Sequence, residues 1–238
     1  MKNIELLYPE YCNIYGESYS IEYLSRCSSD INVIRTNNRE TPAFVDRDVD
    51  MIYLGCSPER KQEHIISLLM PYKDRIRELI DKGTLFLITG NAIEIFGESI
   101  TDGDRVIPAL DIFDFTATRY MNRERHNSQY IGTFVNDEGE EMTMLGHRSQ
   151  FSFAYGDFSH KKWLDISIGI GMNPDTKDEG IHYNNFFATY SLGPCLIMNP
   201  PFAKYLLRKL GLDDTLLFEK EAMEAYEYRK AELIRTLG

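Results

Sequence analysis

The stretch from Thr84 to Gly97 restricts the fold more than any other part of the chain. Its apolar run over 85–88 is typical of a strand buried on both faces of a parallel sheet. The run stops at Thr89-Gly90-Asn91, and a short segment with helical apolar spacing, 92–96, follows at once. A strand, a sharp turn and a helix in this order form the geometry in which α/β hydrolytic enzymes hold a nucleophile at the carboxyl edge of the sheet.

Gly90 occupies the apex of this predicted turn. The apex residue needs a strained or positive φ, and its side chain points into the crevice above the strands. Glycine relieves the strain, but it also removes the side chain that could attack a substrate. The sequence therefore predicts the architecture of a nucleophilic enzyme without the nucleophile.

Strand-like and helical segments alternate through the first ninety residues. Strands are predicted at 4–8, 31–35, 50–54 and 84–89. Helices are expected between them, one of them with Ser57 as its N-cap and Pro58 at its first position. This alternation predicts an α/β fold with a doubly wound, mostly parallel sheet flanked by helices.

Beyond Asp102 the segments become shorter and richer in turn residues. Turn signals separate strand-like pieces at 105–120, 128–136, 141–146 and 150–155. This pattern predicts an added antiparallel layer on one side of the parallel sheet. A further strand is expected at 167–172.

Helical spacing returns after Asn199. Asp213 or Asp214 is expected to cap a last, highly charged helix that runs to Leu237. No linker or repeat interrupts the chain, so we expect a single domain over residues 1–238.

The composition excludes several classes of partner. The net charge of -11 argues against nucleic acid and anionic membranes, because phosphate binding needs clustered Lys and Arg. No apolar run approaches the 18 residues of a membrane span, and no leader-like segment begins the chain, so we expect a cytoplasmic protein without membrane insertion. The four cysteines lack CxxC spacing, which predicts reduced thiols and neither a zinc site nor a disulfide framework.

No pattern of ligands indicates a metal or a cofactor. Glu94, Asp111 and Asp114 lack a spacing that would place two ligands on one face, so surface or capping roles are expected for them. The glycine-containing pieces at 55–58 and 169–171 lack the lysine of a phosphate loop. We therefore expect no bound nucleotide.

Short motifs along most of the chain carry a family resemblance. They are Leu7-Tyr8-Pro9 with Asn13-Ile14-Tyr15-Gly16, Gly55–Gln62, Glu179–Tyr183 and Ala188–Pro194. In this order they resemble the signatures of the cobyric-acid-synthase-like glutamine amidotransferases, and among these the GatD-type glutaminase subunits of lipid II isoglutaminyl synthase. The resemblance implies a class I glutamine amidotransferase-like (flavodoxin-like) fold and a Cys–His site that hydrolyses glutamine to ammonia.

The chain departs from this family at the two reactive positions. The resemblance places the family's cysteine at Gly90 and its histidine at Leu192. The oxyanion loop, glycine throughout in the family, reads Gly55-Cys56-Ser57, and Asn91 follows the apex. The arginine that holds the substrate falls near Phe153. Loss of the nucleophile or the base alone costs about 10⁶-fold in kcat in a catalytic triad, so hydrolysis by the usual route is expected to be nil.

Other side chains could replace the lost groups. Cys56 lies beside a predicted helix N-terminus that would lower its thiol pKa, although a small buried thiol in place of glycine is the competing interpretation. The same two interpretations apply to Cys195, which follows Leu192 on a turn. His182 lies in a family-like motif and is either a site residue or a hydrogen-bonded structural histidine. His147 and Arg148 would start a segment at the mouth of the site.

The leading hypothesis is therefore a catalytically inactive pseudo-glutaminase. By resemblance, its partner would be a Mur-ligase-like amidoligase that acts on peptidoglycan precursors in cell-wall synthesis. A second hypothesis is a hydrolase or transferase that uses Cys56. A third is a sensor that binds glutamine or a related small molecule without cleaving it.

Overall fold

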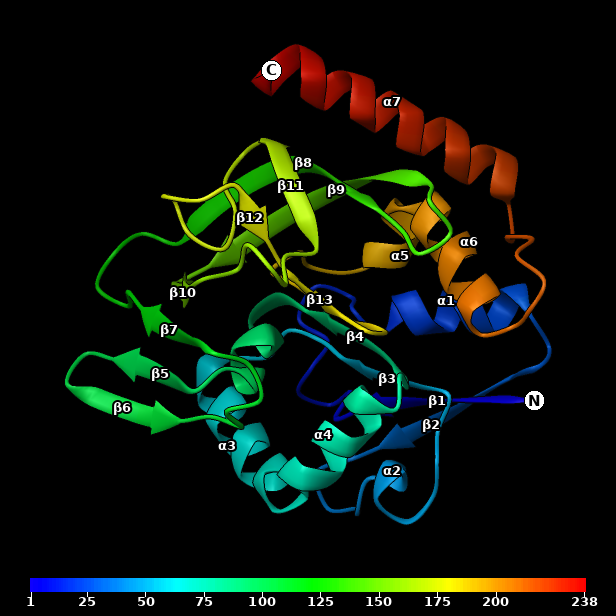
Figure 1. The fold of residues 1–238 in the computed structure, drawn as a ribbon. Helices are drawn as coiled ribbons and strands as arrows, with labels where there is room; N and C mark the ends of the chain where they lie inside the picture. The colour runs from blue at the N-terminus through cyan, green and yellow to red at the C-terminus, as the bar shows by residue number, and fades with distance from the viewer.

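The computed structural model describes residues 1–238 and is built around a six-stranded sheet, with strand order β13-β14-β4-β3-β1-β2 (Figure 1). All neighbouring strands pair in parallel except β13, which is antiparallel to β14. The strands are β1 (Lys2–Leu7), β2 (Ile31–Thr36), β3 (Met51–Leu54), β4 (Leu85–Thr89), β13 (Ile181–Tyr183) and β14 (Phe186–Thr189). The predicted, mostly parallel α/β sheet is confirmed, and its four N-terminal strands lie where the sequence placed them.

Helices and further strands cover the two faces of this sheet, so β3 and β4 are buried along their whole length. On one face lie α2 (Ala43–Asp46), α3 (Glu59–Leu69), the 3-10 turn η1 (Met70–Tyr72) and α4 (Lys73–Asp81). On the other lie α1 (Tyr19–Cys27), α5 (Cys195–Met198) and α6 (Pro200–Lys209). Side chains alternate along β3, so Ile52 packs in the α3 core and Tyr53 in the α1–α6 core.

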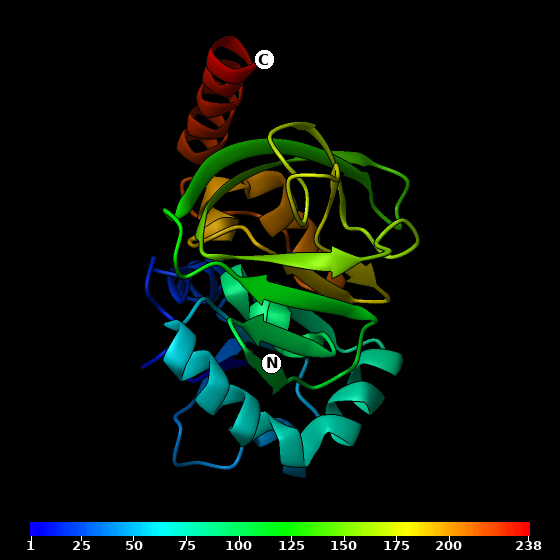
Figure 2. The same ribbon diagram turned by 90° about the vertical axis from the view of Figure 1, so that its left-hand side faces the viewer.

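The predicted antiparallel layer is in fact two separate four-stranded sheets (Figure 2). One has the order β10-β7-β5-β6 and contains β5 (Ser99–Asp102), β6 (Arg105–Pro108), β7 (Phe115–Arg119) and β10 (Ser152–Gly156). The other has the order β12-β11-β8-β9 and contains β8 (His126–Val135), β9 (Glu141–Gln150), β11 (Leu164–Ile168) and β12 (Asp178–Glu179). One pair, β5 with β7, is parallel.

Three predicted boundaries were wrong. The strand expected at 167–172 is β11, which ends at Ile168 because the chain turns at Gly169 with φ +99°. Ser57 does not cap α3: the helix begins at Glu59, and the Ser57 hydroxyl has no hydrogen bond. The last helix, α7 (Glu219–Leu237), begins after Phe218, because Asp213 and Asp214 bind Thr215 and Arg208 instead of capping it.

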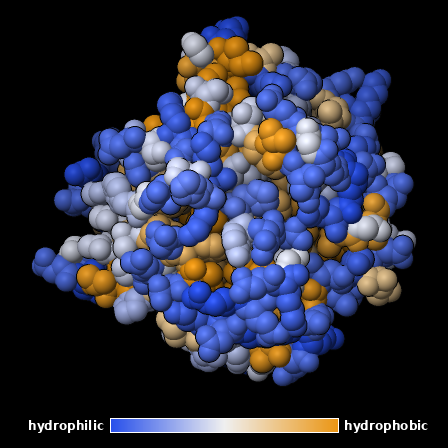
Figure 3. All heavy atoms as spheres, in the orientation of Figure 1, coloured by the Kyte–Doolittle hydropathy of each residue, from blue (hydrophilic) through white to orange (hydrophobic).

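The C-terminal helix α7 lies on the outer face of the β8–β9 sheet (Figures 1 and 2). Only Tyr226 and Leu233 of this helix are buried, and they pack with Ile131 and Leu145 in a cluster separate from the two main cores. At 19 residues α7 is the longest helix, and neither it nor any shorter one combines the length and apolar character that a membrane span needs. Hydrophilic residues dominate the face of the molecule in Figure 3, and apolar groups are scattered over it.

Candidate functional site

The turn at the end of β4 has the predicted geometry. Gly90 has φ +65°, and its N–H donates to the Ser191 carbonyl at 2.9 Å. The chain then enters the 3-10 helix η2 (Gly90–Phe96), whose residues are all buried. The preceding residue, Thr89, directs its hydroxyl to Tyr53 at 2.9 Å. Gly90 is therefore the residue at the apex.

A side chain at position 90 would have no room. A Cβ atom built on Gly90 would lie 2.6 Å from Cβ and 3.0 Å from Sγ of Cys56, and 3.1 Å from Cδ2 of Leu192. Separations below about 3 Å do not occur between real carbon atoms without displacement. The fold thus brings together three positions from the ends of different strands, and the side chains of Cys56 and Leu192 fill the space beside the apex.

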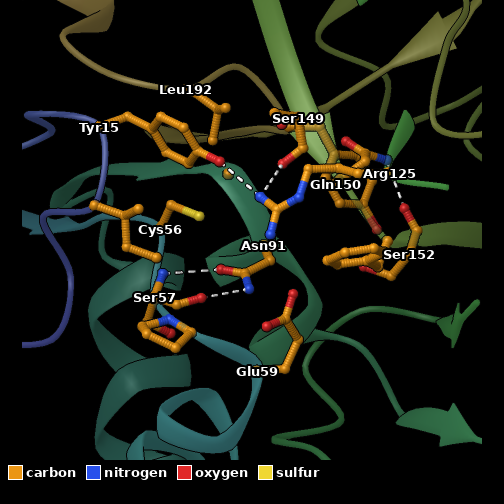
Figure 4. Close-up of a pocket in the computed structure, with 15 residues that line it drawn as sticks. Tyr15, Cys56, Ser57, Glu59, Asn91, Arg125, Ser149, Gln150, Ser152 and Leu192 are labelled. Atoms are coloured by element: carbon orange, nitrogen blue, oxygen red, sulfur yellow. Dashed lines mark hydrogen bonds between the residues drawn. The ribbon is translucent and has the colours of Figure 1, made fainter. Parts of the chain in front are cut away.

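A cavity of about 260 Å³ opens beside these residues (Figure 4). Its lining includes Cys56, Ser57, Gly90, Asn91 and Leu192, five of the positions that the sequence singled out. Gly55, a sixth, does not reach the cavity, because its Cα faces the buried side chain of Glu17.

The Asn91 side chain locks the loop that follows β3. Its Oδ1 accepts the Ser57 N–H at 3.0 Å, and its Nδ2 donates to the Ser57 carbonyl at 2.7 Å (Figure 4). Both polar groups of the Ser57 backbone are therefore satisfied inside the protein. An oxyanion in the cavity could not receive the Ser57 N–H unless this pair of bonds first opened.

Cys56 is a poor nucleophile in this environment. Burial raises the pKa of its thiol to about 12, and the opposing effect of the Asn91 backbone N–H does not compensate. The thiolate is the reactive form, so the thiol is almost wholly protonated at neutral pH. Desolvation is the largest influence on this thiol pKa, and it is opposite in sign to the lowering expected at a helix N-terminus.

The structure places two other predicted residues away from the cavity. Cys195 begins α5 and is fully buried in the α1–α6 core, where burial raises its thiol pKa to about 12. His182 lies on β13, where its ring stacks on Phe187 with a centroid separation of 4.3 Å and its Nε2 hydrogen-bonds to the Asn184 carbonyl at 3.0 Å. The geometry of both residues is that of structural groups.

The segment that was expected to carry the substrate-holding arginine lies differently. Arg148 is fully buried and forms an ion pair with Glu179 at 3.3 Å, and neither Arg148 nor His147 lines the cavity. Phe153 also points elsewhere: its ring packs on His126 at 5.3 Å. The part of this segment that does reach the cavity is 149–152.

Sequence reasoning missed Arg125. Its Nη1 donates to the Tyr15 hydroxyl at 2.7 Å, so the guanidinium extends across the cavity from a loop 110 residues away in sequence (Figure 4). Glu59, at the start of α3, lines the opposite side. Tyr15 lies in a motif that was noticed, but nothing in the sequence near Arg125 indicated which site it would enter.

Glu94 was expected at the surface or in a cap, and this was wrong. The carboxyl group is completely buried, where Ser152, Gln62 and Tyr190 hydrogen-bond to it. Burial raises the pKa of this carboxyl group, and it is the largest of several effects on that pKa. Its role is to join η2 to α3 and β10 behind the cavity.

Comparison with known proteins agrees with this geometry. The CobB/CobQ-like glutamine amidotransferase domain matches residues 3–199. The chain belongs to this family. The matched region contains the central sheet, Gly90, Leu192 and every cavity residue named above, whereas α6 and α7 lie beyond it.

Two curated relatives are GatD subunits of lipid II isoglutaminyl synthase (glutamine-hydrolyzing). The Staphylococcus aureus (strain N315) protein is 28% identical over 195 residues, which is 82% of this chain and 76% of that protein. The Streptococcus pneumoniae (strain ATCC BAA-255 / R6) protein is 22% identical over 238 residues, with 94% of this chain and 90% of that protein covered.

Solved structures share the fold. PurLQS from Thermotoga maritima aligns with a TM-score of 0.55 at 11% identity and covers 96% of this chain and 99% of that chain. A glutamine amidotransferase from the same organism aligns with a TM-score of 0.52 at 12% identity, covering 98% and 94% of the two chains. The fold of this amidotransferase-like domain is therefore the class I glutamine amidotransferase-like α/β fold, with antiparallel sheets added.

Proposed function

We propose that this member of the family does not hydrolyse glutamine and acts as a pseudo-glutaminase subunit. The observation that carries the proposal is the filled space around the apex. Gly90 supplies no nucleophile, Leu192 supplies no base, and the side chains of Cys56 and Leu192 occupy the volume that a side chain at position 90 would need. Because removing one member of a catalytic pair already costs about 10⁶-fold in kcat, loss of both leaves no route for amide cleavage.

Two further observations support inactivity over a relocated nucleophile. The Cys56 thiol has a pKa of about 12 and no histidine lines the cavity to accept its proton. The Ser57 N–H is already bonded to Asn91, so an oxyanion would lack this donor. Both features favour the pseudo-glutaminase over the alternative in which Cys56 attacks an amide.

The function that such a chain retains would be binding to another protein. The curated relatives are named as subunits of a larger synthase, and a chain that keeps the fold but not the chemistry can still hold such an assembly together. We propose that the partner is a Mur-ligase-like amidoligase acting on cell-wall precursors, and that this chain stabilises it or regulates it. The ligase would then take its nitrogen from ammonia rather than from glutamine cleaved here.

A glutaminase assay tests the proposal directly. The purified chain, alone and together with an amidoligase encoded beside it, is incubated with glutamine, and glutamate release is measured against a protein-free blank. We expect no release in either case. Release that persists in Cys56→Ala and Cys195→Ala would contradict inactivity, whereas release lost only in Cys56→Ala would establish the alternative enzyme. Failure of the two proteins to co-purify would contradict the partner role.

A further inference from the structure

The cavity beside Gly90 still has the features of a binding site. Ser57 and Gln150 are 2% and 6% exposed, and both line it. Ser57 Oγ and Gln150 Oε1 nevertheless have no hydrogen-bond partner. Unpaired buried polar atoms are costly, so two of them on residues of one cavity favour a polar ligand there.

Two charges of opposite sign flank these atoms. Arg125 forms no ion pair: its guanidinium donates to the Tyr15 hydroxyl and the Ser149 carbonyl and lies over the Phe151 ring at 4.4 Å. Glu59, on the opposite wall, likewise has no cationic partner. A ligand with a carboxylate and an ammonium group would satisfy both walls, with charge-assisted hydrogen bonds to Arg125 and Glu59.

The inner end of the cavity is apolar. Cys56 is 6% and Leu192 2% exposed, and their side chains present only carbon, hydrogen and a protonated thiol. The Asn91 side chain cannot serve the amide of a glutamine placed there, because it is already bonded to Ser57 at both ends. An aliphatic group in the same position would give up no hydrogen bonds, and the burial of its apolar surface would favour binding.

We infer that this cavity binds, intact, an α-amino acid with an aliphatic side chain, its charged end between Arg125 and Glu59 and its side chain against Leu192 and Cys56. The inference rests on the proposed loss of hydrolysis and adds a ligand of a different kind from an amide. The side chains of Ser57 and Gln150 turn towards the cavity so that Ser57 Oγ and Gln150 Oε1 accept hydrogen bonds from the ammonium group. The Arg125 guanidinium exchanges the Tyr15 hydroxyl for the carboxylate.

Binding is tested by calorimetry and thermal shift on the full chain. The probes are L-leucine, L-methionine and L-glutamine, with leucinamide and N-acetyl-L-leucine to remove one charge each. We expect saturable binding of leucine or methionine, at least about tenfold tighter than glutamine, and a loss of about tenfold or more with either modified leucine, as expected for one charge-assisted hydrogen bond. Equal or tighter binding of glutamine, or no saturable binding of any probe, overturns the inference.

Matched variants locate the site. Arg125→Gln is expected to weaken leucine binding by about tenfold or more, and Ser57→Ala by a smaller factor, because each removes one polar contact. Arg123→Gln, a change of the same kind on the same exposed loop but outside the cavity lining, is expected to leave binding unchanged. Equal effects of Arg125→Gln and Arg123→Gln overturn the assignment. Glutamate assayed in the glutamine samples separates the two proposals: its formation contradicts inactivity, whereas intact glutamine without leucine binding contradicts only this inference.

Discussion

At the scale of single residues, the cavity beside Gly90 differs from a site that has simply lost side chains, because neighbouring side chains fill the space at the apex. In the proposed pseudo-glutaminase, Gly90 and Leu192 stand where the resemblance places the reactive groups, and Cys56 stands where it places a glycine. The side chains of Cys56 and Leu192 fill the space that a side chain at position 90 would need. Restoring one residue should therefore fail, because its space has been taken.

Gly90→Cys should destabilise the protein and give no glutaminase. The new side chain needs φ +65° and also collides with Cys56, so we expect a loss of about 2–4 kcal/mol from backbone strain and overpacking together. Gly103→Cys is the matched control, because Gly103 has φ +60° and nothing within 4 Å of a Cβ. It should cost only the strain, about 1–2 kcal/mol.

The double variant Gly90→Cys with Cys56→Gly isolates the collision. Removing the Cys56 side chain frees the space, so urea unfolding should return the double variant to within about 1 kcal/mol of Gly103→Cys. A single Gly90→Cys variant as stable as Gly103→Cys would show that Cys56 does not occupy the position of the missing side chain.

The buried thiols predict a decline of stability at alkaline pH. Burial raises the pKa of both Cys56 and Cys195 to about 12, above the value of about 8.5 in an unfolded chain. Their contribution is complete below pH 8.5 and is lost progressively as the pH rises towards 12, because only the unfolded chain ionises in that interval. Cys195→Ala should flatten the decline of unfolding free energy between pH 8.5 and 10, as measured in urea. A parallel decline in wild type and variant would contradict the assignment.

At the scale of elements, the site depends on how loops join the sheet to helices. The sequence predicted the β4 turn well, because a buried apolar run, a glycine and a helical segment are all local signals. It failed at the start of α3, where Ser57 looked like a cap. The Asn91 side chain holds the Ser57 backbone outside the helix instead. Because the two residues are 34 positions apart, the sequence around Ser57 contains no sign of this bond.

Asn91→Ala should loosen the loop between β3 and α3. The change leaves the Ser57 N–H and carbonyl buried without partners, which costs about 2–4 kcal/mol for two backbone groups. Asn122→Ala, at an exposed asparagine without side-chain hydrogen bonds, should stay within about 0.5 kcal/mol of wild type. Amide hydrogen exchange should show faster exchange at Ser57 in Asn91→Ala alone. Unchanged protection there would show that Asn91 is not the lock.

At the scale of the whole molecule, the alternation of strands and helices was enough to predict the parallel sheet. Strands that are buried on both faces of a sheet appear in the sequence as continuous apolar runs. The later strands are short and half-exposed, and their pattern does not record which of them pair. One predicted layer therefore proved to be two sheets. Arg125 escaped prediction for the same reason, because only the assembled sheets bring its loop to Tyr15.

A buried ion pair lies within the β12-β11-β8-β9 sheet and links it to the end of β14 in the central sheet. Arg148 on β9 meets Glu179 on β12 at 3.3 Å, and Glu179 also accepts the Tyr190 N–H at 2.9 Å just beyond β14. Both side chains are fully buried, so removing one partner leaves a charge or a neutralised carboxyl without compensation. Arg148→Met should therefore cost about 3–5 kcal/mol in urea unfolding.

The exposed helix pair Lys220–Glu224 provides the comparison, and Lys220→Met should change stability by less than about 0.5 kcal/mol. Arg148→Met combined with Glu179→Gln should recover part of the loss, because the amide keeps its hydrogen bonds to β14 without a charge. Tyr190, whose N–H bonds Glu179, also lines the cavity. A loss below about 1 kcal/mol in Arg148→Met would mean that the apolar cores alone hold the β12-β11-β8-β9 sheet against the central sheet, and that the pair does not position the segment after β14 that carries Leu192.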